Sequence, residues 1–292
     1  MGSRWLLDLL LIVAVAALAL IAWFQPGIEQ PPETQPLTTL SPETVAHIRI
    51  TRAGQDALAL ERDTEGRWFL DHQPPLPADA AQVAALTRLA TQEPERSYSA
   101  GELELDRLAL APPAATVMFD DTRFEFGATD PLEGLRYVRN GERVYLVPDI
   151  YQHLIDAGPE RFLRRRLIPE QGTITALSLP GLSLEKQQHK WLVTPEQDVA
   201  ADRVQRLVEQ WQQAAALDVT IVAADVRDED NTDHIEVTLA EPAQNLEFVI
   251  VAREPELVLL RPELGLRYRM GEAGNNLLAL PSADAGTADT AP

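Results

Sequence analysis

The residues best suited to acid–base, metal or nucleophilic chemistry are scattered along this sequence. No histidine belongs to an HxH or HExxH motif or to a pair at helical spacing; the five are His47, His72, His153, His189 and His234. There is no cysteine, and no serine lies in a GxSxG motif. Ser183–Lys186 matches SxxK, but in a strand pattern residues three apart lie on opposite faces. Glycine-rich phosphate-binding motifs are also missing. The sequence therefore predicts no catalytic, cofactor-binding or metal-binding residue, and we expect a protein that is not an enzyme.

The densest acidic run, Asp225–Asp233, raises the question of a calcium loop. An EF-hand register that starts at Asp228 places Asp233 at the glycine position and Leu239 at the position of the terminal glutamate. Because the register fails at two required positions, we favour a solvated loop. A weak cation site at residues 225–233 remains the alternative.

Four arginines, Arg161 and Arg164–Arg166, form a basic cluster in an otherwise acidic chain of net charge −20. One interpretation is a docking patch for an acidic partner or a phosphate. The other is an intramolecular clamp, in which the arginines pair with carboxylates of the two units described below and fix the relative orientation of these units. We favour the clamp because carboxylates are so abundant. The overall negative charge disfavours binding to nucleic acid.

An apolar segment, Trp5–Phe24, stands at the start of the chain and contains one charge, Asp8. Twenty helical residues span about 30 Å, the thickness of the hydrocarbon core of a bilayer. Trp5 at one end, with Trp23 and Phe24 at the other, would lie at the two interfaces. We expect residues 1–24 to form a cytoplasmic stub and a transmembrane helix of the inner membrane, with the body periplasmic. A proline-rich linker, residues 25–44, follows.

The rest of the chain reads as two tandem units, residues 45–168 and 169–281. Each begins with short alternating runs typical of strands, continues with an amphipathic helix, and ends with further strands. Trp191 lies 123 positions after Trp68, and Asp202 lies 123 positions after Asp79, which indicates a duplication. Residues 282–292 are small and polar, and we expect them to form a disordered tail. The expected fold class is α+β: a transmembrane helix, then two related units of mostly antiparallel sheet, each with a packed helix.

The body resembles a family of bacterial envelope proteins of unknown function that are encoded beside gliding-motility-type ABC transporters. The residues that carry the resemblance are Trp68, Leu105–Pro113, Phe126–Gly127, Arg136–Val138, Val144–Val147 and Phe162–Arg164. The family usually has glycine where Ala109 stands, and an acidic residue where Arg165 stands. The resemblance implies a protein partner, with ABC transporter subunits suspected, and implies no catalytic residue.

These observations favour a membrane-anchored, extracytoplasmic accessory protein without enzymatic activity. A second hypothesis is a module that binds a small molecule, saccharide or peptide in a groove between the units. Its aromatic lining would come from Trp68, Trp191 and Trp211. The third hypothesis is a hydrolase whose site has no recognisable motif.

Overall fold

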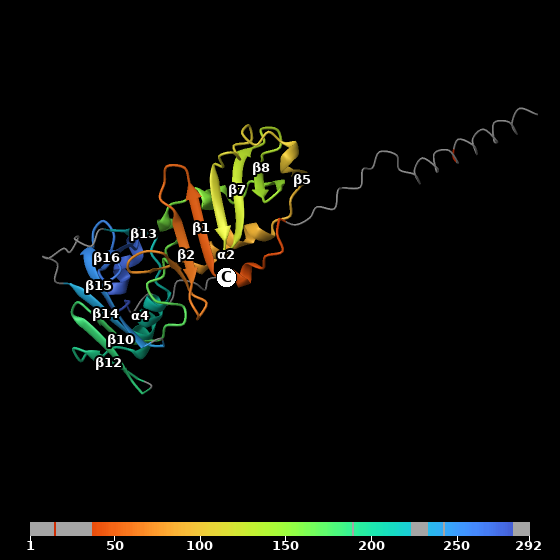
Figure 1. The fold of residues 1–292 in the computed structure, drawn as a ribbon. Helices are drawn as coiled ribbons and strands as arrows, with labels where there is room; N and C mark the ends of the chain where they lie inside the picture. Colours follow the sequence, from red (N-terminus) through yellow and green to blue (C-terminus); the bar gives the residue numbers. More distant parts are fainter. Residues whose placement is uncertain (1–14, 16–36, 189, 223–232, 242, 283–292) are drawn as a thin grey trace, which may run out of the picture.

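The computed structural model describes Val15 and residues 37–188, 190–222, 233–241 and 243–282. It consists mainly of two antiparallel sheets, drawn from orange to green and from green to blue in Figure 1. The alternation of buried and exposed residues explains why these segments form strands with one face in the core. Strand β1 (His47–Arg52), for example, alternates exposed and buried residues along its whole length.

The first sheet contains nine strands in the order β4-β3-β2-β1-β6-β7-β8-β9-β5. Their bounds, after β1, are β2 (Leu58–Arg62), β3 (Trp68–Leu70), β4 (Leu76–Pro77), β5 (Arg96–Ser99), β6 (Ala115–Phe119), β7 (Thr122–Thr129), β8 (Leu135–Asn140) and β9 (Arg143–Pro148). Helix α2 (Ala80–Thr87) begins at the expected N-cap, since the Asp79 carboxylate accepts hydrogen bonds from the backbone N–H groups of Ala81 and Gln82. The short helix α3 (Gln152–Ile155) follows β9.

The second sheet contains eight strands in the order β12-β11-β10-β14-β15-β16-β17-β13. Their bounds are β10 (Ile174–Leu179), β11 (Leu182–Gln187), β12 (Lys190–Thr194), β13 (Asp218–Ile221), β14 (His234–Ala240), β15 (Ala243–Ala252), β16 (Val258–Arg261) and β17 (Leu266–Arg269). Helix α4 (Ala201–Gln213) buries Val204, Leu207, Val208 and Trp211, the face that its sequence predicts. The Trp211 ring lies 6.1 Å from that of Phe248, so α4 packs on β15.

The two sheets share one topology. In each, five strands follow the main helix and the first of these lies at the far edge; three strands precede the helix in the second sheet, and the three equivalent strands plus β4 precede it in the first. The difference is β4, a two-residue strand that pairs with the outer side of β3 and has no counterpart beyond β12 among the described residues.

The expected α+β class with a leading transmembrane helix is wrong. Alternating strands dominate, and the α-helices of the two sheets have only 8, 4 and 13 residues. Within the described residues, no helix has both the length and the apolar composition needed to cross a bilayer. The expected anchor falls outside the described residues except for Val15, and so do its ends Trp5, Trp23 and Phe24. The fold is instead two antiparallel sheets with few helices.

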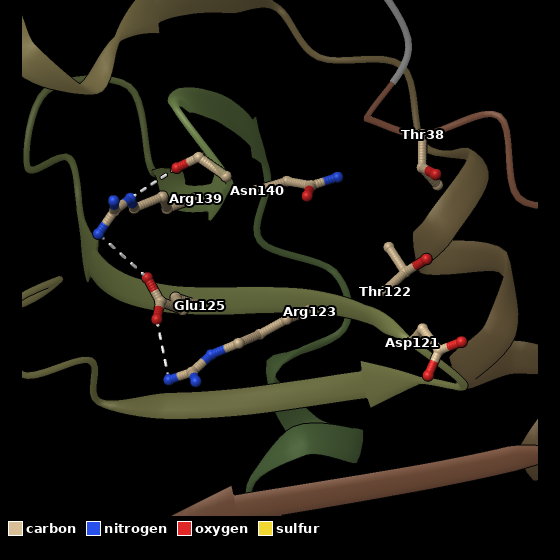
Figure 2. Close-up of a pocket in the computed structure, with 8 residues that line it drawn as sticks. Thr38, Asp121, Thr122, Arg123, Glu125, Arg139 and Asn140 are labelled. Carbon is tan, nitrogen blue, oxygen red and sulfur yellow. Dashed lines mark hydrogen bonds and ion pairs between the residues drawn. The ribbon is translucent and has the colours of Figure 1, made fainter.

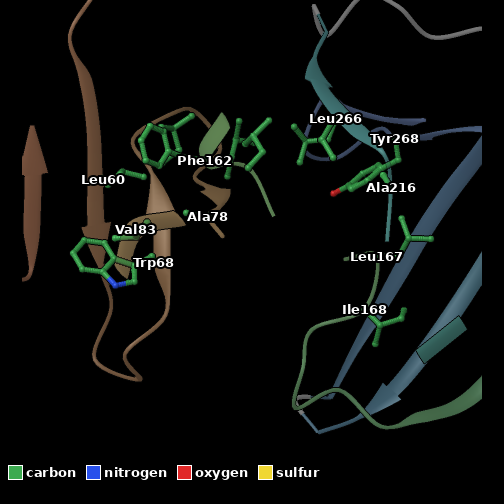
Figure 3. Close-up of a cluster of buried hydrophobic side chains, with 14 of the residues drawn as sticks. Leu60, Trp68, Ala78, Val83, Phe162, Leu167, Ile168, Ala216, Leu266 and Tyr268 are labelled. Atoms are coloured by element: carbon green, nitrogen blue, oxygen red, sulfur yellow. The ribbon is translucent and has the colours of Figure 1, made fainter. Parts of the chain in front are cut away.

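One buried cluster runs through both sheets and through the segment that joins them. Phe162, Leu163, Leu167 and Ile168 of that segment are each at most 1% exposed. Figure 3 shows Phe162 on the side of the first sheet, and Leu167 and Ile168 on the side of the second, with Leu167 the nearer of the two to Tyr268. The joining segment is therefore part of the core rather than a loose tether.

Candidate functional site

The segment Phe162–Ile168, called the joint below, is hydrogen-bonded to both units through its backbone. On the side of the first unit, Arg164 N donates to Pro77 O (2.9 Å), and Asp79 N donates to Phe162 O (2.7 Å). On the side of the second unit, Leu167 N donates to Ala214 O (3.0 Å), and Ala216 N donates to Arg165 O (2.9 Å). Isolated β-bridges join Leu163 to Ala78 and Arg166 to Ala215. Backbone bonds on both sides fix the direction in which the arginines of this segment project.

The predicted arginine cluster lies on and just before the joint, and most of its charge is unpaired. Arg161 and Arg165 are exposed and form no ion pair with any described residue. Arg166 approaches Glu170 (Nη1–Oε1, 3.8 Å) within the same stretch of chain, so this pair does not link the two sheets. Among the described residues, no arginine of the cluster forms an ion pair that links the two units, and the role of the cluster stays a prediction.

Arg164 is the arginine of this cluster that is directed into the interior. Its Nε atom is buried and has no hydrogen-bond partner among the described residues. Burial lowers the pKa of the Arg164 guanidinium, and the charges of Arg261 and Arg67 lower it further, whereas Tyr268 and Glu170 act in the opposite direction. Arg164 is half-buried, and a buried Nε–H without a partner costs stability, which distinguishes Arg164 from the exposed Arg161 and Arg165.

Sequence reasoning missed Arg261 and Tyr268, which lie on the side of the second sheet that faces the joint. Arg261 is 4% exposed, and its Nε donates to Glu263 Oε1 at 2.5 Å. Its guanidinium lies 6.0 Å from the centre of the Phe248 ring. Burial raises the pKa of the Tyr268 hydroxyl. The only sequence signal was the position of Arg261 at the end of an apolar run, and arginine at such a position is usually exposed.

The residues that carry the family resemblance converge on packing contacts in the first sheet. The loop Leu105–Pro113 lies against β7, where Ala128 N donates to Leu108 O (2.7 Å). A Cβ atom on Gly127 would lie 2.2 Å from Leu108 O, so only glycine fits there. Leu110 and Val144 form a small second core with Tyr137 at its margin. Ala109 has φ +52°, a left-handed conformation that glycine adopts more readily than alanine.

A bidentate ion pair holds the same region together. Arg136 Nε and Nη2 donate to the two carboxylate oxygens of Asp149 at 2.8 and 2.9 Å, and Thr129 Oγ1 donates to Asp149 Oδ2 (3.0 Å). Arg136 Nη1 also donates to Gly127 O (2.7 Å). Burial raises the pKa of Asp149, but the hydrogen bonds and charge of Arg136 and the Thr129 hydroxyl outweigh it and lower the pKa. Each nitrogen of the Arg136 guanidinium donates to a protein group, which favours a structural role.

Two polar hollows lie at comparable places on the two sheets. One, of about 540 Å³, is lined by β7, β8 and their adjoining turns, where Glu125 pairs with Arg123 (2.9 Å) and Arg139 (3.5 Å) (Figure 2). The other, of about 470 Å³, is lined by β14–β16 and includes Glu247 and Arg261. Both are open depressions in which the arginines already pair with carboxylates of the same hollow.

The other predicted candidates do not come together. The described part of the chain has no group of three or more histidine, cysteine or acidic side chains that could hold a metal ion. His189 and most of the acidic run 225–233 lie outside the described residues; Asp233, at its end, pairs with Arg253 (2.6 Å).

The three tryptophans that would line a groove between the units are separated. Trp68 is 8% exposed in the core of the first sheet. Trp211 is fully buried in the second, where its Nε1 donates to Leu277 O (2.8 Å). Trp191 lies partly exposed on the edge strand β12. The described residues therefore offer no shared aromatic groove.

Comparison with protein families finds one match, to a family described as a domain of unknown function (DUF4340), over residues 68–242. This range begins in β3 and ends after β14, so it includes the joint and parts of both sheets. No curated protein and no solved structure matches the chain.

Proposed function

This chain belongs to the DUF4340 family of domains of unknown function, and from that premise we propose that it is a non-enzymatic accessory protein that docks an acidic protein partner at its joint. The observation that carries the proposal is the pair Arg161 and Arg165. Both are exposed cations without ion pairs among the described residues, in a chain with 45 acidic and 25 basic residues. Free cations in such a surface attract an acidic partner.

The geometry around the pair supports docking more than clamping. Arg165 is held by its backbone, which leaves its guanidinium free, and the joint is attached to both sheets by backbone hydrogen bonds rather than by arginine–carboxylate pairs. Because the backbone of Arg165 is already fixed in the free protein, less conformational entropy is lost when a partner binds there. We further propose that the partner belongs to an ABC-type transport system and that the body works on the periplasmic side of a bacterial inner membrane. The family resemblance seen in the sequence supports both the transport-system partner and the periplasmic location.

The test is quantitative co-purification of the tagged full chain from gently solubilised membranes. Arg161→Ala/Arg165→Ala should reduce the recovered partner about tenfold, because two charges at the rim of an interface each contribute up to about 1 kcal/mol. Thermal stability should stay the same, since the backbone bonds of the joint remain. Arg49→Ala/Arg143→Ala removes the same charge from exposed positions on the first sheet and serves as the matched control.

Two outcomes would refute the docking role. In one, the double variant unfolds several degrees earlier than wild type, which would make the pair a clamp. In the other, both double variants recover as much partner as wild type.

A further inference from the structure

The edge strand β12 differs from its counterpart in the first sheet. There, β3 is covered by β4: Leu70 pairs with Leu76, Phe69 pairs with Pro77, and Ala78 N donates to Trp68 O (2.8 Å). Among the described residues, no strand pairs with the outer side of β12, and residues 195–200 donate no backbone hydrogen bond to it. An uncovered edge strand exposes a row of N–H and C=O groups that can pair with another chain.

The register of the β11–β12 hairpin identifies the backbone groups that are free. Gln187 pairs with Lys190, Lys186 with Trp191, and Leu184 with Val193. In a tight hairpin the pair next to the turn exchanges hydrogen bonds and the pairs alternate from there. The N–H and C=O groups of Trp191 and Val193 therefore point away from β11. Trp191 occupies the place of Trp68, whose C=O accepts a hydrogen bond from Ala78 N, directly after β4.

The side chains of β12 are also incompletely covered. Trp68, beneath β4, is 8% exposed, whereas Trp191 and Val193 are partly exposed and Leu192 is 47% exposed. A strand added beyond β12 would bury apolar surface that the first sheet buries with its own β4.

Charge indicates what kind of strand would bind. The only two lysines of the chain, Lys186 and Lys190, both lie on this hairpin. Both are exposed, and neither forms an ion pair with a described residue. Lysines on an edge disfavour edge-to-edge pairing of identical chains and favour an acidic segment.

We propose that β12 binds an extended acidic segment of a partner protein by antiparallel strand addition, in the manner in which β4 pairs with β3. This inference rests on the proposed accessory function and names a second contact with the partner. Main-chain hydrogen bonds to Trp191 and Val193 would supply affinity, and Lys186 and Lys190 would select acidic sequences.

The test uses a fluorescent peptide with the sequence of residues 71–79, which contains β4 and two aspartates, and the full chain as receptor. Val193→Pro removes one outward N–H and should weaken binding about tenfold, since one lost hydrogen bond leaves its partner unsatisfied. Val193→Ala is the matched control for lost packing and should have a smaller effect. Lys186→Glu/Lys190→Glu should weaken binding about fivefold at low salt and less at high salt. Thermal unfolding of Val193→Pro close to that of Val193→Ala establishes that the proline variant is folded.

Three results would overturn the proposal: no saturable peptide binding to wild type, equal affinity of Val193→Pro and Val193→Ala, or a wild-type dimer that Val193→Pro converts to a monomer. The last would make a second copy the occupant of the edge. None of these results bears on partner recovery by Arg161→Ala/Arg165→Ala, so failure at β12 is distinguishable from failure of the proposed function.

Discussion

Replacing Gly127 by alanine should destabilise the first sheet, because the added methyl group has no space beside the loop Leu105–Pro113. The new Cβ would lie 2.2 Å from Leu108 O, and 2.9 and 3.0 Å from two carbons of the Leu110 side chain. Contacts between carbon and oxygen atoms prefer about 3.5 Å, so the loop must retreat by about 1 Å. The backbone oxygen cannot move alone, because Leu108 O accepts the hydrogen bond from Ala128 N (2.7 Å).

The magnitude follows from what that movement breaks. Loss of the Ala128–Leu108 hydrogen bond costs about 1 to 3 kcal/mol where a group is left unsatisfied. Displacement of Leu110, which is 1% exposed, costs about another 1 to 2 kcal/mol as overpacking strain. Alanine restricts the unfolded chain and returns about 0.5 to 1 kcal/mol. The net loss is about 1 to 4.5 kcal/mol; at the middle of that range, about 3 kcal/mol, the Tm falls by about 6 to 12 °C.

The assay is thermal unfolding followed by circular dichroism, with Gly101→Ala as the control. Gly101 has ordinary backbone angles, and its nearest neighbour for an added Cβ is Ser99 Oγ at 3.9 Å, so its Tm should stay within about 1 °C of wild type. Equal Tm values for the two variants would refute the reasoning, because they would mean that the loop does not pack tightly on β7.

Two further predictions concern the same region. Ala109→Gly should raise stability by about 0.5 kcal/mol, because relief of a left-handed backbone (φ +52°) slightly exceeds the added freedom of the unfolded chain; a clear loss in urea unfolding would contradict this. The pKa of Asp149 is lower in the folded state than in the unfolded chain, so its contribution to stability is fully present above the unfolded pKa of about 4 and is lost as pH falls through the folded pKa. Asp149→Asn should therefore lower the free energy of unfolding at pH 7, and should make that free energy fall less steeply below about pH 4 in a pH series of urea unfolding. If the variant loses stability below about pH 4 as steeply as wild type, the pair with Arg136 does not depend on this carboxylate.

Local patterns in the sequence predict much of the secondary structure. The apolar positions Val204, Leu207, Val208 and Trp211 recur at helical spacing, and all four are buried on α4. Asp79 caps α2 through its own side chain, a contact that depends on residues two and three positions away. Such features depend on near neighbours in the chain, which is why spacing alone reveals them.

The features that sequence reasoning missed depend on residues far apart in the chain. Arg261 is buried because Phe248 and Glu263 surround its guanidinium, and nothing in its own run indicates this. The joint needs two partners, Pro77 and Ala214, that lie on opposite sides of it in both sequence and space. The predicted fold class is wrong in its leading transmembrane helix, since no helix of the described residues could cross a bilayer, and strands outnumber helices among those residues.

The central claim, that the joint presents free arginines to an acidic partner, is tested most directly by quantifying the protein that co-purifies with the tagged full chain. Arg161→Ala/Arg165→Ala should recover about a tenth of the wild-type amount at unchanged Tm, while Arg49→Ala/Arg143→Ala recovers the wild-type amount. Equal recovery with all three chains would contradict the claim.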